Sequence, residues 1–309
     1  MRVTVLINPN ARLAHNHDGT GLREQIEAGF AARGIAAEIV AAAGEALPEA
    51  AAAAVDAARR GEVDAVIAGG GDGSIGTVAG LLAGSGIPLG ILPLGTLNHF
   101  ARDLGIPPDL DAAIGLIADG ATRAIDVAEV NGHAFVNNSS VGFYAILVLE
   151  RERLQNDRGL SKWAAMMLAC LRLLRRFSLR RLTVAAEGRR MQHRTPLVFV
   201  GNNAYRLHPP ELGTRACLDD GRLWICVARQ QNRRQLLWLA CRSLLGLRQS
   251  LQELEIVCAD SAEIESRASR LPVAVDGEVR IMHPPLRYRA RPGALQVFAS
   301  PRAIEPEPL

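Results

Sequence analysis

A glycine-rich segment, Gly69-Gly70-Gly71-Asp72-Gly73-Ser74, separates a short apolar run from a stretch with helical periodicity. Glycines let a backbone approach a ligand closely and turn its amides toward phosphate oxygens, and the following helix dipole favours the same anion. Asp72 alone would repel phosphate, so we expect it to reach a nucleotide through Mg²⁺ or to accept hydrogen bonds that shape the loop. The segment therefore predicts a phosphate-binding loop, with a glycine turn that binds no ligand as the alternative.

Two better-known phosphate motifs fit this chain poorly. A Walker-type loop needs Gly-Lys-Ser/Thr, whereas the only lysine, Lys162, follows Ser161. The spacing Gly71-x-Gly73-x-x-Gly76 matches the dinucleotide-binding pattern. That match is weak, because the loop follows the third expected strand and no acidic residue stands about 20 positions further on to hold a ribose.

A second polar loop, residues 93–101 (Pro-Leu-Gly-Thr-Leu-Asn-His-Phe-Ala), follows the next expected strand. Loops at the carboxyl ends of adjacent parallel strands converge on one crevice, where α/β sheets bind ligands. Thr96 and Asn98 could donate hydrogen bonds to a ligand there, or either could cap the helix that follows. A third candidate, Glu278, comes directly after the turn dipeptide Asp276-Gly277, which would hold its carboxylate out on a tight loop.

The first half of the chain alternates short apolar runs with helical patterns, as in strands of a parallel sheet joined by crossover helices. The elements expected from these patterns are strands over 3–8, 36–40, 65–68 and 88–92, and helices over 21–33, 47–60, 74–83 and 98–104. The glycine-rich loop then lies between a doubly buried strand and a helix, which is the position that a phosphate-binding loop requires.

From about residue 123 strand-like runs follow one another, which predicts a β-sandwich of antiparallel sheets. The expected strands are 122–130, 133–139, 179–186, 197–201, 223–227, 254–258, 271–275 and 294–299. Two helical stretches, 144–177 and 233–247, interrupt them.

Composition excludes several classes of protein. The 309 residues are 49% hydrophobic and 22% charged, which excludes a disordered chain. The net charge of +3 is too small to indicate a nucleic-acid partner. Five cysteines without a Cys-x-x-Cys pair favour neither a disulfide framework nor a thiolate zinc site. We expect no signal peptide and no transmembrane segment, hence a cytoplasmic protein.

Together these motifs resemble the diacylglycerol kinase catalytic family, which includes bacterial lipid kinases and, more distantly, sphingosine and ceramide kinases. The resemblance is carried in chain order by Asn8-Pro9-Asn10, Gly-Gly-Asp-Gly-Ser at 70–74, Pro-Leu-Gly-Thr-Leu-Asn at 93–98, Asp126-Val127 and Val-Asp-Gly-Glu at 275–278. Gly-Gly-Asp-Gly alone also occurs in NAD kinases and phosphofructokinases, so the combination is the specific feature.

The resemblance implies an ATP-binding α/β domain over 1–124, a β-rich lipid-substrate domain over 125–293, and a last strand that returns to the first domain within 294–305. It implies that ATP contacts a set of loop residues and that Glu278 and Asp72 are catalytic. The ATP set is Asn8, Asn10, Gly70, Gly71, Asp72, Gly73, Ser74, Gly76, Thr96 and Asn98. It also suggests a second Mg²⁺ held by the Asp220 carboxylate and by backbone carbonyls of Cys217 and Arg222, with an ordinary Asp-Gly turn as the alternative.

An apolar stretch from Lys162 onward carries Arg172, Arg175 and Arg176. Such a helix can lie on an anionic membrane or pack against the core with its arginines in solvent. We therefore expect an ATP- and Mg²⁺-dependent kinase of diacylglycerol or a related lipid, working on the inner face of the membrane. A kinase of a soluble acceptor such as NAD and a nucleotide-binding regulatory protein without turnover are the alternatives, and the sequence leaves a homodimer open.

Overall fold

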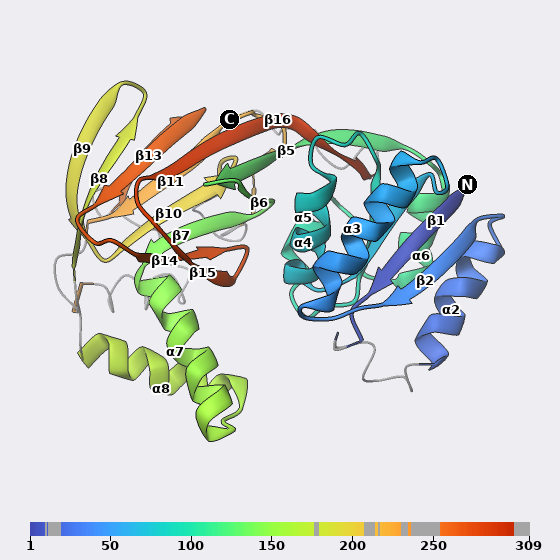
Figure 1. Ribbon diagram of the computed structural model, residues 1–309, viewed down its shortest axis with the longest axis horizontal. Coiled ribbons are helices and arrows are strands. Elements are labelled where there is room, and N and C mark those ends of the chain that lie inside the picture. Colours follow the sequence, from blue (N-terminus) through green and yellow to red (C-terminus); the bar gives the residue numbers. More distant parts are fainter. Residues whose placement is uncertain are drawn as a thin grey trace.

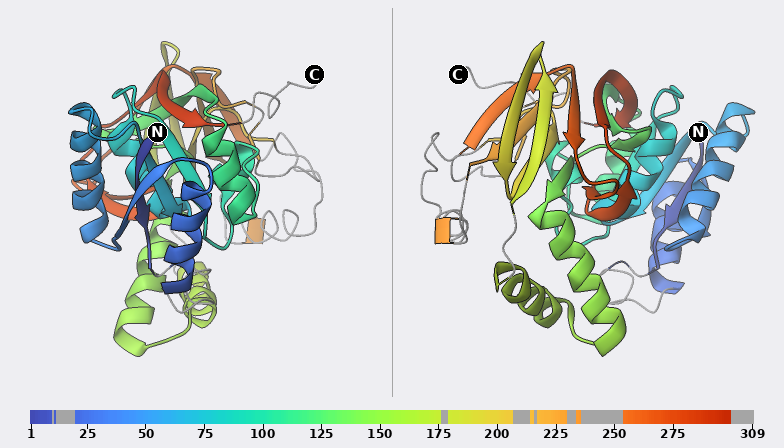
Figure 2. Two further views of the ribbon diagram at one scale, coloured as in Figure 1. Left: turned by 90° about the vertical axis from the view of Figure 1, so that its right-hand side faces the viewer. Right: turned by 60° about the vertical axis from the view of Figure 1, so that its left-hand side comes forward.

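The computed structural model describes residues 1–9, 11, 20–175, 179–206, 214–215, 217–229, 234–235 and 254–299. These residues form an α/β half, a β-sandwich half and a helical hairpin that projects from the sandwich (Figures 1 and 2). Each half has its own hydrophobic core. The expected combination of a largely parallel α/β domain and a β-sandwich is confirmed.

The α/β half is built on four parallel strands in the order β2-β1-β3-β4. β3 and β4 are buried along their whole length, as their apolar sequences require. The strands are β1 (Arg2–Ile7), β2 (Ala36–Ala41), β3 (Ala65–Gly70) and β4 (Leu89–Pro93), and the helices are α2 (Thr20–Ala31), α3 (Ala46–Arg59), α4 (Asp72–Leu82), α5 (His99–Asp103) and α6 (Leu110–Ala118). The sequence analysis missed α6, although Asp109 caps it by accepting a hydrogen bond from the amide of Ala112.

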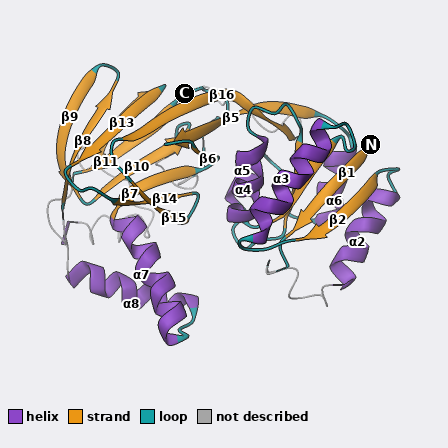
Figure 3. Ribbon diagram, in the orientation of Figure 1, coloured by secondary structure: helices purple, strands orange, loops and turns teal. Residues whose placement is uncertain are grey.

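The sandwich half pairs a six-stranded antiparallel sheet with the far end of the first sheet (Figure 3). The six-stranded sheet has the order β12-β11-β10-β7-β14-β15. Its strands are β7 (Asn138–Gly142), β10 (Leu197–Asn202), β11 (Leu223–Ala228), β12 (Leu254–Ala259), β14 (Leu271–Val275) and β15 (Glu278–Met282). The opposing layer consists of β5 (Thr122–Val130), β6 (His133–Phe135), β8 (Arg180–Ala186), β9 (Arg189–Thr195), β13 (Ser261–Ser266) and β16 (Leu286–Phe298).

The last strand, β16, joins the two halves (Figure 1). Its first part pairs antiparallel with β13 in the sandwich, and Val297 near its end pairs in parallel with Leu89 of β4. The expected return of the chain to the first domain is confirmed. Both β5 and β16 run through the two halves, and the exact division at residue 124 stays a prediction.

Several elements differ from those expected. The single helical stretch over 144–177 is two helices, α7 (Phe143–Arg158) and α8 (Lys162–Arg175), because Gly159 ends α7 with a φ of 61°. Strands β9, β13 and β15 were missed, since their alternation of charged and apolar residues is short or irregular. The helix expected over 233–247 lies outside the described residues, apart from 234–235.

A buried carboxylate stabilises the place where β16 passes from one half to the other. The register of β16 against β5 shifts between Arg291 and Leu295. Asp126 of β5 fills this irregularity, because its carboxylate accepts hydrogen bonds from the amides of Gly293 at 2.9 Å and Gly221 at 2.6 Å. The side chain is almost completely buried, so these donors must compensate for its lost hydration.

We predict that Asp126→Ala lowers the free energy of unfolding by about 2–4 kcal/mol, because the amides of Gly221 and Gly293 lose their charged acceptor. Urea denaturation measures the loss. The matched control is Asp111→Ala, which removes a largely exposed carboxylate paired with Arg33 at 2.9 Å and should therefore cost far less stability. Equal losses in the two variants would contradict the role assigned to Asp126.

Candidate functional site

A cleft of about 750 Å³ lies where the carboxyl ends of β1, β3 and β4 meet the turn between β14 and β15. The sequence-predicted residues that line it are Asn8, Gly71, Asp72, Gly73, Ser74, Thr96 and Glu278. A smaller cavity of about 270 Å³ shares part of this wall and adds Gly76, His133 and Asp276. Motifs up to 270 positions apart in the sequence therefore converge on one site, while Asn10 lies outside the described residues.

The glycine-rich loop leads from β3 directly into α4. Gly70 is the last residue of β3, and Gly71 precedes the first turn of α4 in an extended conformation, without a side chain to cap it. Ser74 in that turn accepts a hydrogen bond from the side chain of Asn8 at 2.8 Å. The first amides of a helix have no partner within the helix, so this uncapped end of α4 presents donors suited to an anion.

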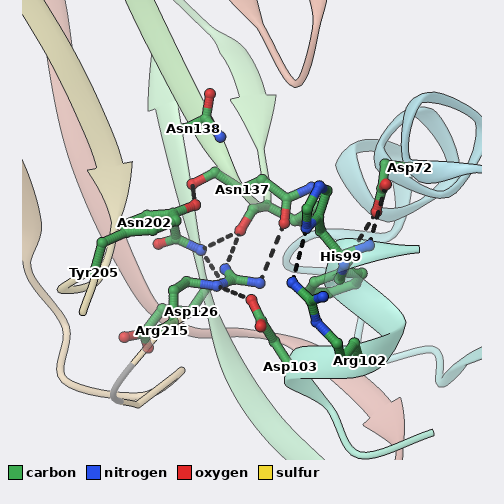
Figure 4. Close-up of polar contacts among 12 residues, drawn as sticks. Asp72, His99, Arg102, Asp103, Asp126, Asn137, Asn138, Asn202, Tyr205 and Arg215 are labelled. Atoms are coloured by element: carbon green, nitrogen blue, oxygen red, sulfur yellow. Dashed lines mark hydrogen bonds and ion pairs between the residues drawn. The ribbon is translucent and has the colours of Figure 1, made fainter. Parts of the chain in front are cut away.

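Asp72 connects the glycine-rich loop to the second loop (Figure 4). Its two carboxylate oxygens accept hydrogen bonds from the backbone amides of His99 and Phe100, at 3.1 and 3.0 Å. These amides begin α5, so Asp72 caps that helix from a different part of the chain. Of the two expectations for Asp72, the shaping of a loop is observed directly, and its carboxylate also lines the cleft.

Asn98 maintains the shape of the second loop. Its side-chain amide donates to the carbonyls of Pro93 and Gly95 at 3.0 and 3.1 Å, and its carbonyl oxygen accepts from the amide of Gly95 at 3.0 Å. Asn98 itself adopts a left-handed conformation with a φ of 47°, which asparagine tolerates better than most residues. It stands at the N-cap of α5 without a capping side-chain bond, and Thr96 lies exposed at the cleft.

Asp276 organises the opposite wall of the cleft. Its carboxylate accepts hydrogen bonds from three consecutive amides, Val136 at 2.8 Å, Asn137 at 2.8 Å and Asn138 at 3.0 Å. Burial of the carboxylate raises its pKa to about 6, against the lowering effect of these donors. Its carboxylate lies close to α4, because a β-carbon at position 76 would be only 3.0 Å from the Oδ2 atom of Asp276 and would crowd it.

Glu278 is two residues beyond Asp276, at the start of β15 and on the rim of both cavities. Its side chain is 57% exposed and forms an ion pair with Arg280 at 3.5 Å. Its Oε1 atom lies 3.9 Å from the position that a β-carbon on Gly73 would take. An exposed carboxylate therefore faces the glycine-rich loop from the other half of the molecule.

Two features were not predicted from the sequence: Arg280, which lines the cleft, and the structural role of Asp276, which lines the smaller cavity. Arg280 follows Glu278 at the spacing that places two side chains on the same face of a strand, so the pattern Glu-x-Arg was a usable signal. The hydrogen bonds of Asp276 to a turn 140 positions earlier left no local signal in the sequence.

The proposed second metal loop lies apart from the residues that line the cleft. Asp220 and Arg222 are exposed and Cys217 is half-buried. The carbonyl of Arg222 already accepts a hydrogen bond from the amide of Asn203 at 2.9 Å. Within the described parts of the chain, no cluster of three or more His, Cys, Asp or Glu side chains could hold a metal ion. The metal site over residues 217–222 stays a prediction.

Two family models match this chain. The model of the diacylglycerol kinase catalytic domain matches residues 2–130. The model of the YegS C-terminal NAD kinase beta sandwich-like domain matches residues 144–299. The first match contains the glycine-rich loop and Asn98, and the second contains Asp276 and Glu278, so the cleft forms where the two matched regions meet.

Curated relatives and solved structures agree with this result. A protein of Pseudomonas fluorescens named "Probable lipid kinase YegS-like" is 34% identical over 236 residues, which is 75% of this chain and 76% of that relative. A Citrobacter koseri protein of the same name is 50% identical over 94 residues, and that match spans only 29% of this chain and 31% of the relative's length. A Bacillus anthracis crystal structure assigned to the diacylglycerol kinases has a TM-score of 0.74 at 25% identity, covering 97% of this chain and 98% of the other.

We predict that Asn98→Gly lowers the free energy of unfolding by about 1–3 kcal/mol, because three loop hydrogen bonds are lost while the left-handed backbone stays allowed. Asn98→Ala should cost about 1 kcal/mol more, since it adds strain at a φ of 47°. Urea denaturation of both variants separates the two effects. A glycine variant as stable as the parent would show that the amide bonds contribute nothing.

Proposed function

The chain belongs to the diacylglycerol kinase catalytic family, and on that basis we propose that it is an ATP- and Mg²⁺-dependent kinase that phosphorylates a hydroxyl of diacylglycerol or a related lipid. The observation that carries the proposal is the position of Glu278 opposite the glycine-rich loop, on the wall of one cleft. The loop that would bind the phosphate donor and the carboxylate that would accept the proton then come from opposite halves of the molecule, with the lipid hydroxyl between them.

ATP would bind with its phosphates at the uncapped N-terminus of α4, beside Asn8 and Ser74. A carboxylate beside bound phosphates also suits Mg²⁺, which takes oxygen ligands and commonly uses one or two carboxylates together with substrate phosphates. Asp72 would supply such a carboxylate, because each of its oxygens accepts an amide hydrogen bond and has a further lone pair for a metal ion. Bound Mg²⁺ would neutralise phosphate charge.

Glu278 would act as the general base. As the lipid hydroxyl oxygen forms its bond to the γ-phosphorus, the bond from that phosphorus to the β–γ bridging oxygen breaks, and the hydroxyl proton passes to the Glu278 carboxylate. ADP leaves with the bridging oxygen. Arg280, 3.5 Å from Glu278, would hold this carboxylate in place and add positive charge near the transferred group.

The helical hairpin supplies a surface through which the enzyme could reach lipid. Along one line of α8, Trp163 is 81%, Met167 73% and Leu171 48% exposed, while Ala165 and Ala169 on the opposite face are buried. No helix within the described residues is long and apolar enough to cross a membrane. A protruding helix with an apolar outer face, ending in Arg175 and free of acidic residues, suits the interface of an anionic membrane instead.

The arginines of α8 do not all serve this surface. Arg172 forms an ion pair with Glu150 of α7 at 2.6 Å, so it fastens the hairpin rather than facing solvent alone. Arg176 lies outside the described residues. We therefore assign membrane contact chiefly to the apolar stripe and to the exposed Arg175.

Glu278→Gln should lower kcat by about 10²- to 10⁴-fold and leave ATP affinity near that of the parent, because it removes the proton acceptor without changing the loop at α4. Steady-state kinetics on a short-chain, water-soluble diacylglycerol and calorimetric binding of a nonhydrolysable ATP analogue give the two quantities. Glu263→Gln, a carboxylate of β13 outside the cleft, is the control. Equal losses of affinity and rate would place Glu278 in the nucleotide site.

Replacing Trp163, Met167 and Leu171 together by glutamine should reduce binding to anionic vesicles by at least about tenfold, because three apolar side chains no longer enter the bilayer. Activity on vesicles should fall in parallel, while activity on the short-chain substrate persists. Arg153→Gln on α7 is the control for loss of charge from the same hairpin. Co-sedimentation across a salt series measures binding, and unchanged sedimentation of the triple variant would return α8 to the role of a packed helix.

A further inference from the structure

A buried ion pair connects the two halves of the molecule (Figure 4). The guanidinium of Arg215 lies 2.8 Å from the carboxylate of Asp103, and the two side chains are 0% and 6% exposed. Arg215 belongs to the sandwich half, whereas Asp103 is the last residue of α5 in the α/β half. The guanidinium also lies over the ring of Phe100, 5.5 Å from its centroid.

Arg215 uses its remaining donors on the turn that holds Asp276. It donates to the carbonyl of Val136 and, at 3.2 Å, to the side-chain oxygen of Asn137. The amides of these two residues donate in turn to Asp276. The guanidinium of Arg215 thus binds oxygen atoms of this turn, while the carboxylate of Asp276 binds its amides.

The short helix α5 transmits this attachment to the glycine-rich loop. Asp72 accepts the first amides of α5, and Asp103 at its other end binds Arg215. Because α5 has only five residues, the two attachments lie about one helical turn apart. An unbroken path of hydrogen bonds and one helical turn therefore runs from Asp72 to Asp276, two residues before Glu278.

Stability alone does not explain this arrangement. Removing two charges from water is costly, and a buried ion pair is often no more stabilising than apolar residues of the same size. The geometry of a guanidinium is different, because its planar fork can hold a carboxylate, a carbonyl and an amide oxygen at fixed angles at the same time. Lysine could keep the ion pair but could not reproduce the fork.

We propose that Arg215 is a positioning residue that holds Glu278 in register with the glycine-rich loop and carries the effect of nucleotide binding from α5 to the Glu278 turn. The inference rests on the proposed function, since it assigns the loop to nucleotide and Glu278 to the acceptor hydroxyl. Occupation of the loop would order Asp72 and α5, and through Arg215 the segments 135–139 and 276–280 would become more ordered as well.

Two variants distinguish an effect on the position of Glu278 from an effect on folding. Arg215→Lys keeps the charge beside Asp103 and loses the fork. The double variant Asp103→Leu with Arg215→Met removes both charges together, so no uncompensated charge is left buried and the fold should persist. Arg123→Met is the matched control, because it removes an arginine–aspartate pair, to Asp219 at 2.5 Å, whose two residues belong neither to α5 nor to the Val136–Asn138 turn.

The first readout is kinetic. Both Arg215 variants should lose about 10- to 100-fold in kcat on short-chain diacylglycerol, the scale of a misplaced catalytic group, while the Kd of a nonhydrolysable ATP analogue stays within about twofold. Arg123→Met should match the parent. A purely structural role would instead leave the kcat of Arg215→Lys at the parent value once the protein is folded, and that result would overturn the inference.

The second readout does not depend on turnover. In the parent and in Arg123→Met, the ATP analogue should slow hydrogen exchange in residues 135–139 and 276–280, and in the double variant only near the glycine-rich loop and α5. Protection that reaches the Glu278 turn equally in the double variant would overturn the inference while leaving the proposed function intact. A parent that neither binds the analogue nor phosphorylates lipid would overturn the proposed function, and the inference with it.

Discussion

The carboxylate of Asp276 is the contact on which the site depends. It accepts hydrogen bonds from three successive amides at the start of β7, and it lies so close to Gly76 that a β-carbon there would crowd it. The backbone of Asp276 also adopts a left-handed conformation, with a φ of 46°, in the turn that leads into β15. The two halves have separate cores, and Val136 of this turn packs into the core of the α/β half. The polar contacts of Asp276 add direction to that packing and so help to set the distance between the loop and the base.

This division of labour has a physical reason. Apolar burial is non-directional, so it fixes which elements pack together but tolerates small shifts between them. Charged hydrogen bonds depend steeply on distance and angle, and they fix atoms to within a few tenths of an ångström. Asp72, Asp126 and Asp276 each use a carboxylate to hold backbone amides from a distant segment. Asp72 holds α5, Asp126 holds β16, and Asp276 holds the turn that precedes β7 against the segment that carries Glu278.

Much of the fold was readable from the sequence, because its signals are local. A few neighbouring residues are enough to predict β3 and β4, from their apolar runs, and the start of α4, from the glycines before it. The irregular edge strand β9, whose seven residues include three arginines, carries no such periodicity and was missed. The split of the 144–177 helix turned on a single residue, Gly159, in a long favourable pattern.

The candidate site was predictable in its residues but not in its connections. Asp72 and Glu278 stood out because each lies next to a glycine in a segment that the sequence predicts as a loop, where functional side chains are common. Arg215 did not stand out, since its partners Asp103 and Asn137 are 112 and 78 positions away. A carboxylate that reaches across the chain looks the same in sequence as one that faces solvent, so these long-range pairs needed the folded structure.

The most direct test of the account is to incubate the purified protein with γ-labelled ATP, Mg²⁺ and a total lipid extract, and to identify the labelled products by mass after partition between solvent and water. The account predicts label in a lipid that has gained one phosphate, with an equal amount of ADP released, and little label transfer when lipid or Mg²⁺ is omitted. Label found only in a water-soluble product, or ATP bound without any lipid-dependent release of ADP, would contradict it.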